Sequence, residues 1–251
     1  MQKNRFRIIS ILTIILFSTI IGLSSCSSTK TEIPTTAEGV YNEGLMLFKK
    51  EKWTEAQKMF DIVKLQYPAT IYADDAQFYL AEINFKRKEY ILAAFNYNMV
   101  RRIYNKSVYT KDALYKTALS YYQMSPSYDR DQENTLLAIQ TFSEFMAIYP
   151  TDTLAKEAEN KIIELREKLA NKEFQSGEIY RKMENYKSAM IYYNAVIDNY
   201  SDTKVCEEAF ISKMELLKET HKLDDLKVTK ELFERTYPNT RFAKKYQAIN
   251  N

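Results

Sequence analysis

Glycine, proline, histidine and cysteine are scarce in this 251-residue sequence, which has 4, 5, 1 and 2 of them respectively. So few glycines argue against a glycine-rich nucleotide-binding domain, and against an all-β chain with many tight turns. One histidine and two cysteines leave almost no material for a zinc site or a histidine-based catalytic triad. We therefore expect no metal, no cofactor and no catalytic residues, and we predict that the protein is not an enzyme.

A large excess of one charge is also missing, since 36 Lys and Arg stand against 33 Asp and Glu. The excess of three comes from Lys3, Arg5 and Arg7, because the first 25 residues contain no acidic residue. The rest of the chain is neutral and gives no electrostatic case for binding nucleic acid. Aromatic residues make up 14% of the chain, with 20 tyrosines, so disorder is not expected.

The three N-terminal positive charges precede an apolar segment, residues 8–21. As a helix it would rise about 21 Å, less than the roughly 30 Å of a bilayer core. Residues 1–25 therefore have the pattern of a secretory signal peptide rather than of a spanning helix. Their end, Leu23-Ser24-Ser25-Cys26, resembles the bacterial lipobox. The resemblance implies lipid attachment at Cys26 and a lipidated tether over residues 26–36.

A ten-residue phrase recurs five times after the tether. It begins at Tyr67, Tyr104, Tyr149, Tyr200 and Tyr237, so the steps are 37, 45, 51 and 37 residues. Proline or another helix-breaking residue follows each tyrosine, and Ser, Thr or Asp residues are then expected to cap the next helix. A helical repeat of this length indicates an α-solenoid.

The units resemble tetratricopeptide repeats, which place a small residue on the first helix, a second one twelve residues later and an aromatic residue four after that. The first unit has Gly44, Ala56 and Phe60 at this spacing. In the third unit the small residues are 20 apart, which places an eight-residue insertion in its turn. We predict an all-α tetratricopeptide solenoid of about five repeats, with repeats 1–3 in residues 37–150.

A longer helix is expected between the third and fourth repeats. Residues 154–174 contain no glycine or proline, and their apolar residues recur mostly at helical spacing. We predict a connecting helix over residues 151–175, followed by repeats 4–5 and a C-terminal tail in residues 176–251. The fifth repeat is degenerate, with Met214 and Leu226 at its small positions.

The lipobox, the five repeats, the insertion and the long helix occur together in an order that resembles the BamD family, the ComL- and YfiO-like lipoproteins of outer-membrane assembly. Local matches are residues 128–132, 165–174 and 177–181, although Gln132 stands where the family usually has proline. The resemblance implies a scaffold on the periplasmic face of the outer membrane. Its partners would be a BamA-like POTRA/β-barrel protein and unfolded outer-membrane proteins, in a Gram-negative bacterium.

The resemblance also suggests where partners bind, although each residue has a structural explanation as well. Every tyrosine can serve as packing inside the solenoid, and Asp131 can serve at a helix N-terminus. For contact with the barrel protein the candidates are Asp129, Arg130, Asp131, Glu173, Glu178 and Arg181. For a pocket that receives an extended substrate peptide they are Tyr41, Tyr72 and Tyr79.

One other class of protein remains open. A different tetratricopeptide lipoprotein, one that coordinates peptidoglycan machinery, shares the anchor and the repeats. Such proteins often carry a coiled coil before fewer repeats, whereas here only a short tether precedes them. A lytic transglycosylase needs a separate catalytic domain with a deep cleft, and the repeats leave no room for one.

Overall fold

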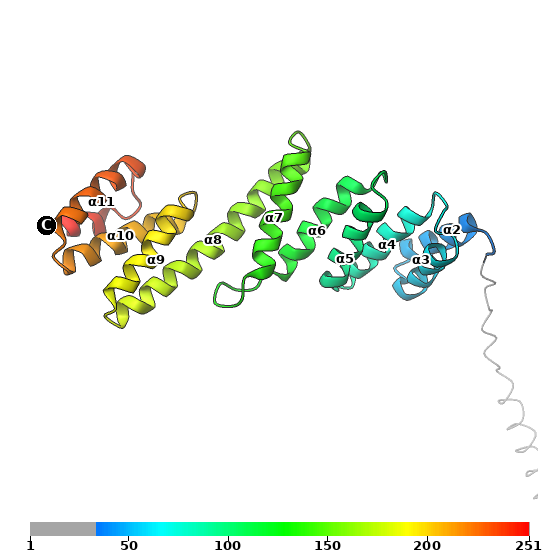
Figure 1. Cartoon of the computed structure of the whole chain (residues 1–251), viewed down its shortest axis with the longest axis horizontal. Helices are drawn as coiled ribbons and strands as arrows, with labels where there is room; N and C mark the ends of the chain where they lie inside the picture. The colour runs from blue at the N-terminus through cyan, green and yellow to red at the C-terminus, as the bar shows by residue number, and fades with distance from the viewer. Residues whose placement is uncertain (1–33, 251) are drawn as a thin grey trace, which may run out of the picture. The chain divides into compact units, whose positions relative to one another are not determined.

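The computed structural model describes residues 34–250, which contain helices and no strand (Figure 1). The predicted signal peptide, the lipid site at Cys26 and most of the tether lie outside the described residues and stay predictions. Among the residues described, no helix has the length and apolar content needed to cross a membrane. The helices are α2 Ala37–Lys49, α3 Trp53–Gln66, α4 Ala73–Lys86, α5 Tyr90–Ile103, α6 Thr110–Met124, α7 Glu133–Ile148, α8 Thr153–Lys182, α9 Tyr186–Asn199, α10 Lys204–Glu219, α11 Leu223–Thr236 and α12 Ala243–Asn250.

Helices α2 to α11 form five antiparallel hairpins, α2/α3, α4/α5, α6/α7, α8/α9 and α10/α11. Each helix packs against the next one along the chain, and α12 packs against α10 (Figure 1). This arrangement confirms the predicted all-α, tetratricopeptide-type solenoid.

The small residues of the repeat pattern lie where paired helices approach most closely. A Cβ atom added to Gly44 would lie 2.9 Å from the ring of Phe60, and one added to Gly177 would lie 2.7 Å from the ring of Tyr193. The corresponding alanines and aromatic residues are fully buried. The predicted function of the pattern, close packing within each hairpin, is therefore confirmed; the buried set is Ala56, Phe60, Ala81, Ala93, Tyr97, Ala118, Ala138, Phe142, Ala189 and Tyr193.

The five recurring tyrosines are the C-cap residues of α3, α5, α7, α9 and α11. The cap prediction for the following helices is right at α8, where the Asp152 carboxylate accepts a hydrogen bond from the Leu154 N–H at 2.9 Å. It is wrong at α4 and α6, whose N-caps are Tyr72 and Tyr109 without a side-chain cap bond. There the threonine hydroxyls stabilise the preceding turn instead, as Thr70 does by donating to the Tyr67 carbonyl.

Four of the five hairpin turns have the same backbone geometry, which the sequence did not reveal. Their central residues, Glu51, Lys88, Glu184 and His221, have φ between 56° and 62°. Two backbone hydrogen bonds, 6→1 and 5→2, close a Schellman motif in each turn. In the turn at His221, the Lys222 N–H donates to the Leu217 carbonyl, and the His221 N–H donates to the Lys218 carbonyl. Glycine is favoured at this position, and none is present.

We predict that His221→Gly stabilises the protein by about 1 kcal/mol, because glycine adopts positive φ without the steric cost that a Cβ atom carries. His221 is exposed, so little packing is lost. The free energy of unfolding from urea titration measures the effect. Lys222→Gly is the matched control, since Lys222 has a φ of −86° and glycine there should destabilise. Equal effects of the two substitutions would contradict the backbone argument.

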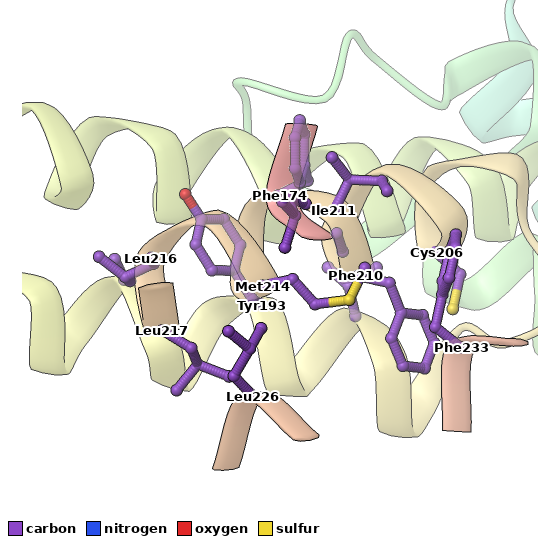
Figure 2. Packing of buried hydrophobic residues seen from close by; sticks show 14 of the residues in the cluster. Phe174, Tyr193, Cys206, Phe210, Ile211, Met214, Leu216, Leu217, Leu226 and Phe233 are labelled. Carbon is purple, nitrogen blue, oxygen red and sulfur yellow. The ribbon is translucent and has the colours of Figure 1, made fainter. Parts of the chain in front are cut away.

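The long helix α8 connects two apolar cores. It runs from Thr153 to Lys182 without a break, through the predicted connecting segment and on into the residues that the repeat pattern assigns to the fourth repeat. Its first half contributes Ala158 and Leu165 to the core shared with α6 and α7. Its second half contributes Ala170 and Phe174 to the core shared with α9, α10 and α11 (Figure 2).

Candidate interaction surfaces

The three tyrosines predicted to form a peptide pocket lie in one aromatic cluster between the first two hairpins. The ring of Tyr41 stacks on Tyr72 with centroids 5.1 Å apart, and lies 6.4 Å from Tyr79. Tyr79 in turn stacks on Phe60 at 5.3 Å. The structure therefore brings the three predicted residues together and joins them to the hairpin core.

The members of this cluster differ in what they offer to a ligand. Tyr41 is buried, and burial together with its hydrogen bond to Asp75 raises the pKa of its phenol well above the ordinary range. Packing accounts for this residue. Tyr72 and Tyr79 are only half-buried and keep part of their rings at the surface. They retain the flat, amphipathic surface that aromatic recognition of a peptide uses.

The insertion in the third repeat forms an ordered loop, residues 125–132, between α6 and α7. Gln132 is buried, and its amide donates to the carbonyls of Ser127 at 2.8 Å and Arg130 at 3.0 Å. Its side-chain oxygen accepts from the hydroxyl of Thr135 at 2.7 Å. Gln132 thus holds the loop from inside.

The predicted contact residues of this loop, Asp129, Arg130 and Asp131, are exposed. The Ser127 hydroxyl donates to Asp129 and lowers the pKa of that carboxyl, so it is charged at neutral pH. Asp131 accepts from the Glu133 N–H at 3.0 Å and so also has the helix-terminal role that the sequence allowed. The loop thus presents alternating charges on a fixed backbone.

Two lysines of α8 attach this loop to the long helix. Lys168 donates to the hydroxyl of Ser125 at 2.7 Å, and Lys172 donates to the carbonyl of Arg130 at 3.1 Å. Sequence reasoning missed both residues. Their four-residue spacing on one helix face was the signal that could have found them. Glu173, the following residue of α8, does not lie at the loop. It is half-buried, and its charge adds to burial in raising the pKa of Tyr192 and Tyr200, which places it beside α9.

We expect Gln132→Ala to destabilise the protein by about 1–2 kcal/mol, because the buried hydroxyl of Thr135 and two loop carbonyls each lose one hydrogen bond. Each keeps another partner, so none is left wholly unpaired. Hydrogen exchange of residues 125–131 should accelerate at the same time. The control is Gln123→Ala on α6, where the glutamine is exposed. If both variants unfold at the same urea concentration, the loop is not held by Gln132.

The C-terminal part of α8 carries the remaining predicted residues, and two of them make contacts inside the chain. Glu178 accepts from the hydroxyl of Tyr193 at 2.6 Å. Arg181 forms ion pairs with Glu215 at 2.9 Å and Glu219 at 3.5 Å, which join α8 to α10. The two glutamates, four residues apart on α10, were also missed.

A cavity of about 330 Å³ lies beside these ion pairs and is lined by Arg181, Lys218, Lys245 and Ile249, among others. The structure therefore does not bring the predicted contact residues into one cluster: three lie in the loop, and of the three on α8 only Arg181 lines this cavity. Binding by either group stays a prediction. Within residues 34–250, no cluster of three or more His, Cys, Asp or Glu side chains is arranged to hold a metal.

The known proteins that this chain resembles are outer-membrane lipoproteins and assembly factors. A family model described as "YfiO: Outer membrane lipoprotein" matches residues 34–232. A relative from Rickettsia prowazekii, named outer membrane protein assembly factor BamD, is 28% identical over 232 residues, which are 91% of this chain and 92% of the relative. Proteins of the same name from Neisseria meningitidis serogroup B and Vibrio cholerae are 24% and 20% identical. The match to the Neisseria protein spans 82% of this chain and 81% of that protein. The match to the Vibrio protein spans 84% of this chain and 92% of that protein.

Proposed function

The chain belongs to the YfiO family of outer membrane lipoproteins, and on this premise we propose that it is a lipid-anchored scaffold that helps assemble β-barrel proteins into the outer membrane. The observation that carries the proposal is the extent of the match, which includes the first four hairpins and most of the fifth. Its curated relatives are named assembly factors, and the chain spans most of their lengths. A helical-repeat scaffold acts by binding, which agrees with our expectation of a protein that is not an enzyme.

The anchor in this proposal is Cys26, with the solenoid held at the periplasmic face of the outer membrane. Ser27 follows the cysteine, so the aspartate that retains some lipoproteins in the inner membrane is absent. Two or three acyl chains give stable attachment, whereas one is marginal. Tethering raises the effective concentration of the solenoid near any membrane partner without a new contact.

The proposed docking surface for the POTRA region of a barrel protein comprises α8, the 125–132 loop and the last two hairpins. Its support is the fixed geometry of the charged groups. The loop is held by Gln132 and by two lysines of α8, and Arg181 is held by two glutamates of α10. Preorganised charges lose little conformational entropy when a partner binds, and they impose a defined orientation on it.

The proposed substrate site is the tyrosine cluster of the first two hairpins, which would receive an extended segment of an unfolded outer-membrane protein. Support comes from the partial exposure of Tyr72 and Tyr79, whose rings stack on Tyr41 and Phe60 of the packed aromatic cluster. A scaffold with a substrate site near one end and a barrel-protein site near the other would keep a captured chain close to the protein that inserts it.

The test is purification of the full-length lipoprotein from its own outer membrane in mild detergent, followed by mass spectrometry. We expect a stoichiometric β-barrel protein with POTRA domains. The Cys26→Ser variant is the control for the anchor and should leave the membrane fraction. Co-purification of peptidoglycan synthases in place of a barrel protein would refute the proposed function and assign the chain to the coordinators of peptidoglycan machinery.

A further inference from the structure

A second surface, remote in sequence from the candidate residues of α8, is a groove between the second and third hairpins. It lies between α5 and α7 over the end of α6, and its volume is about 680 Å³. Its walls carry apolar side chains, Ile91, Phe95, Met99, Met124 and Leu137, together with the polar side chains of Asn98, Asn134 and Tyr121. Ile91 and Phe95 are 73% and 60% exposed, and they lie one helical turn apart on the wall of the groove.

The corresponding grooves elsewhere in the solenoid have different surfaces. Between α3 and α5, Arg87 donates to Gln57 at 2.7 Å and to Thr54 at 2.9 Å, so polar side chains close the gap. Between α9 and α11 the cavity is smaller, and charged side chains such as Lys213 and Asp225 line it beside Met190, Leu217 and Val228. The groove between α5 and α7 is thus larger and has a greater share of apolar lining residues than the cavity between α9 and α11.

The groove has a positively charged side chain at one end and a negatively charged one at the other. Arg102 lines it in the last turn of α5, and Glu133 lines it at the first residue of α7. Because α5 and α7 both pack antiparallel to α6, these residues mark opposite ends. Neither forms an ion pair with another described residue, whereas the neighbouring Arg101 pairs with Glu144. Both charges are thus available to a ligand that carries the complementary pair.

The chemistry of the walls decides which kind of segment fits. An extended peptide about 16 Å long has about ten backbone N–H and C=O groups. Asn98 and Asn134 could pair with only some of them, the described residues offer no strand edge, and the remaining groups would face apolar side chains. A helix satisfies its own backbone and presents only side chains. From Ile91 to Arg102 the groove spans eleven residues of α5, or about 16 Å, the length of about three helical turns.

We propose that this groove binds an amphipathic helix of a partner protein. The helix has apolar residues at positions i, i+4 and i+7, an acidic residue beside Arg102 and a basic residue beside Glu133. Ile91, Phe95 and Met99, spaced four apart, form one wall that interdigitates with the apolar stripe. A membrane surface fits less well, since it is flat and anionic and Glu133 opposes it.

The experiment uses photocrosslinking in the full-length lipoprotein in its native membrane. Phe95 is replaced by p-benzoylphenylalanine, and Ile191 of α9 is replaced in the matched control. Both side chains are 60% exposed, and each follows a fully buried alanine by two residues. We expect at least about tenfold more adduct at position 95 than at 191. The crosslinked residues should lie three and four apart in one segment of one partner.

A charge exchange tests the orientation of the helix. Arg102→Glu should lower the yield at position 95 about tenfold, and a lysine in place of the partner's acidic residue should restore it. Unchanged helicity and melting temperature establish that the variants are folded. The proposal is overturned if the two positions crosslink equally or give no adduct. It is also overturned by adducts on alternate residues of an extended segment, on a second copy of this chain, on residues 1–33 or on phospholipid.

Discussion

Replacing Gly177 by leucine should destabilise the protein by about 3 kcal/mol or more, one of the largest effects of any single substitution in the solenoid. A single Cβ atom at this position already lies 2.7 Å from Cε1 and 2.9 Å from Cδ1 of Tyr193. The ring cannot move aside, because it is fully buried and its hydroxyl donates to Glu178. Figure 2 shows Tyr193 within the apolar core formed by α8, α9, α10 and α11.

The loss of stability should increase with the size of the side chain placed at position 177. Gly177→Ala gains about 1 kcal/mol of helix propensity but still brings its Cβ into the ring, so we expect a smaller net loss. The control is Lys182→Leu on the same helix, where the side chain is exposed and the change should stay within about 0.5 kcal/mol. Urea unfolding of the three variants measures the series. An alanine variant more stable than the parent would show that α8 and α9 have room to separate.

The repeat pattern predicted the hairpins because its physical cause is local. A small residue such as Gly44 or Gly177 is required wherever two helices approach closely, so the spacing of small residues reveals the pairs of helices. The aromatic residue that follows fills the space beside them. Tyr41, Tyr72 and Tyr79 were grouped by the family resemblance and not by this spacing, and the structure places their rings in one cluster.

Long-range polar contacts could not be predicted in this way. The bond from Lys172 to the Arg130 carbonyl joins residues 42 apart, and its geometry depends on how the third hairpin meets α8. The ion pairs of Arg181 with α10 have the same origin. The conformation of the hairpin turns could not be predicted from the sequence for another reason. Glu51 and His221 adopt a positive φ, which their residue types do not favour. The hydrogen bonds of the Schellman motif select the conformation and outweigh residue preference.

Ending the chain after Lys172 should abolish co-purification of the barrel protein while the first three hairpins stay folded. The cut retains the half of α8 that supplies Ala158 and Leu165 to the core with α6 and α7. It also retains Lys168 and Lys172, which hold the 125–132 loop. The fourth and fifth hairpins, with their separate core, are removed. A cut at the predicted repeat boundary near residue 150 would instead delete α8 and expose the third hairpin.

Circular dichroism and thermal unfolding of residues 26–172 test the structural half of this prediction, and a cooperative transition is expected. Capture of the barrel protein from detergent extracts tests the functional half. The reciprocal deletion of residues 37–66, the first hairpin, should leave that capture intact, because it removes part of the tyrosine cluster and none of the docking surface. A folded 26–172 fragment that still captures the barrel protein would move the docking surface to the first three hairpins. A fragment that does not fold would mean that the two cores joined by α8 depend on each other.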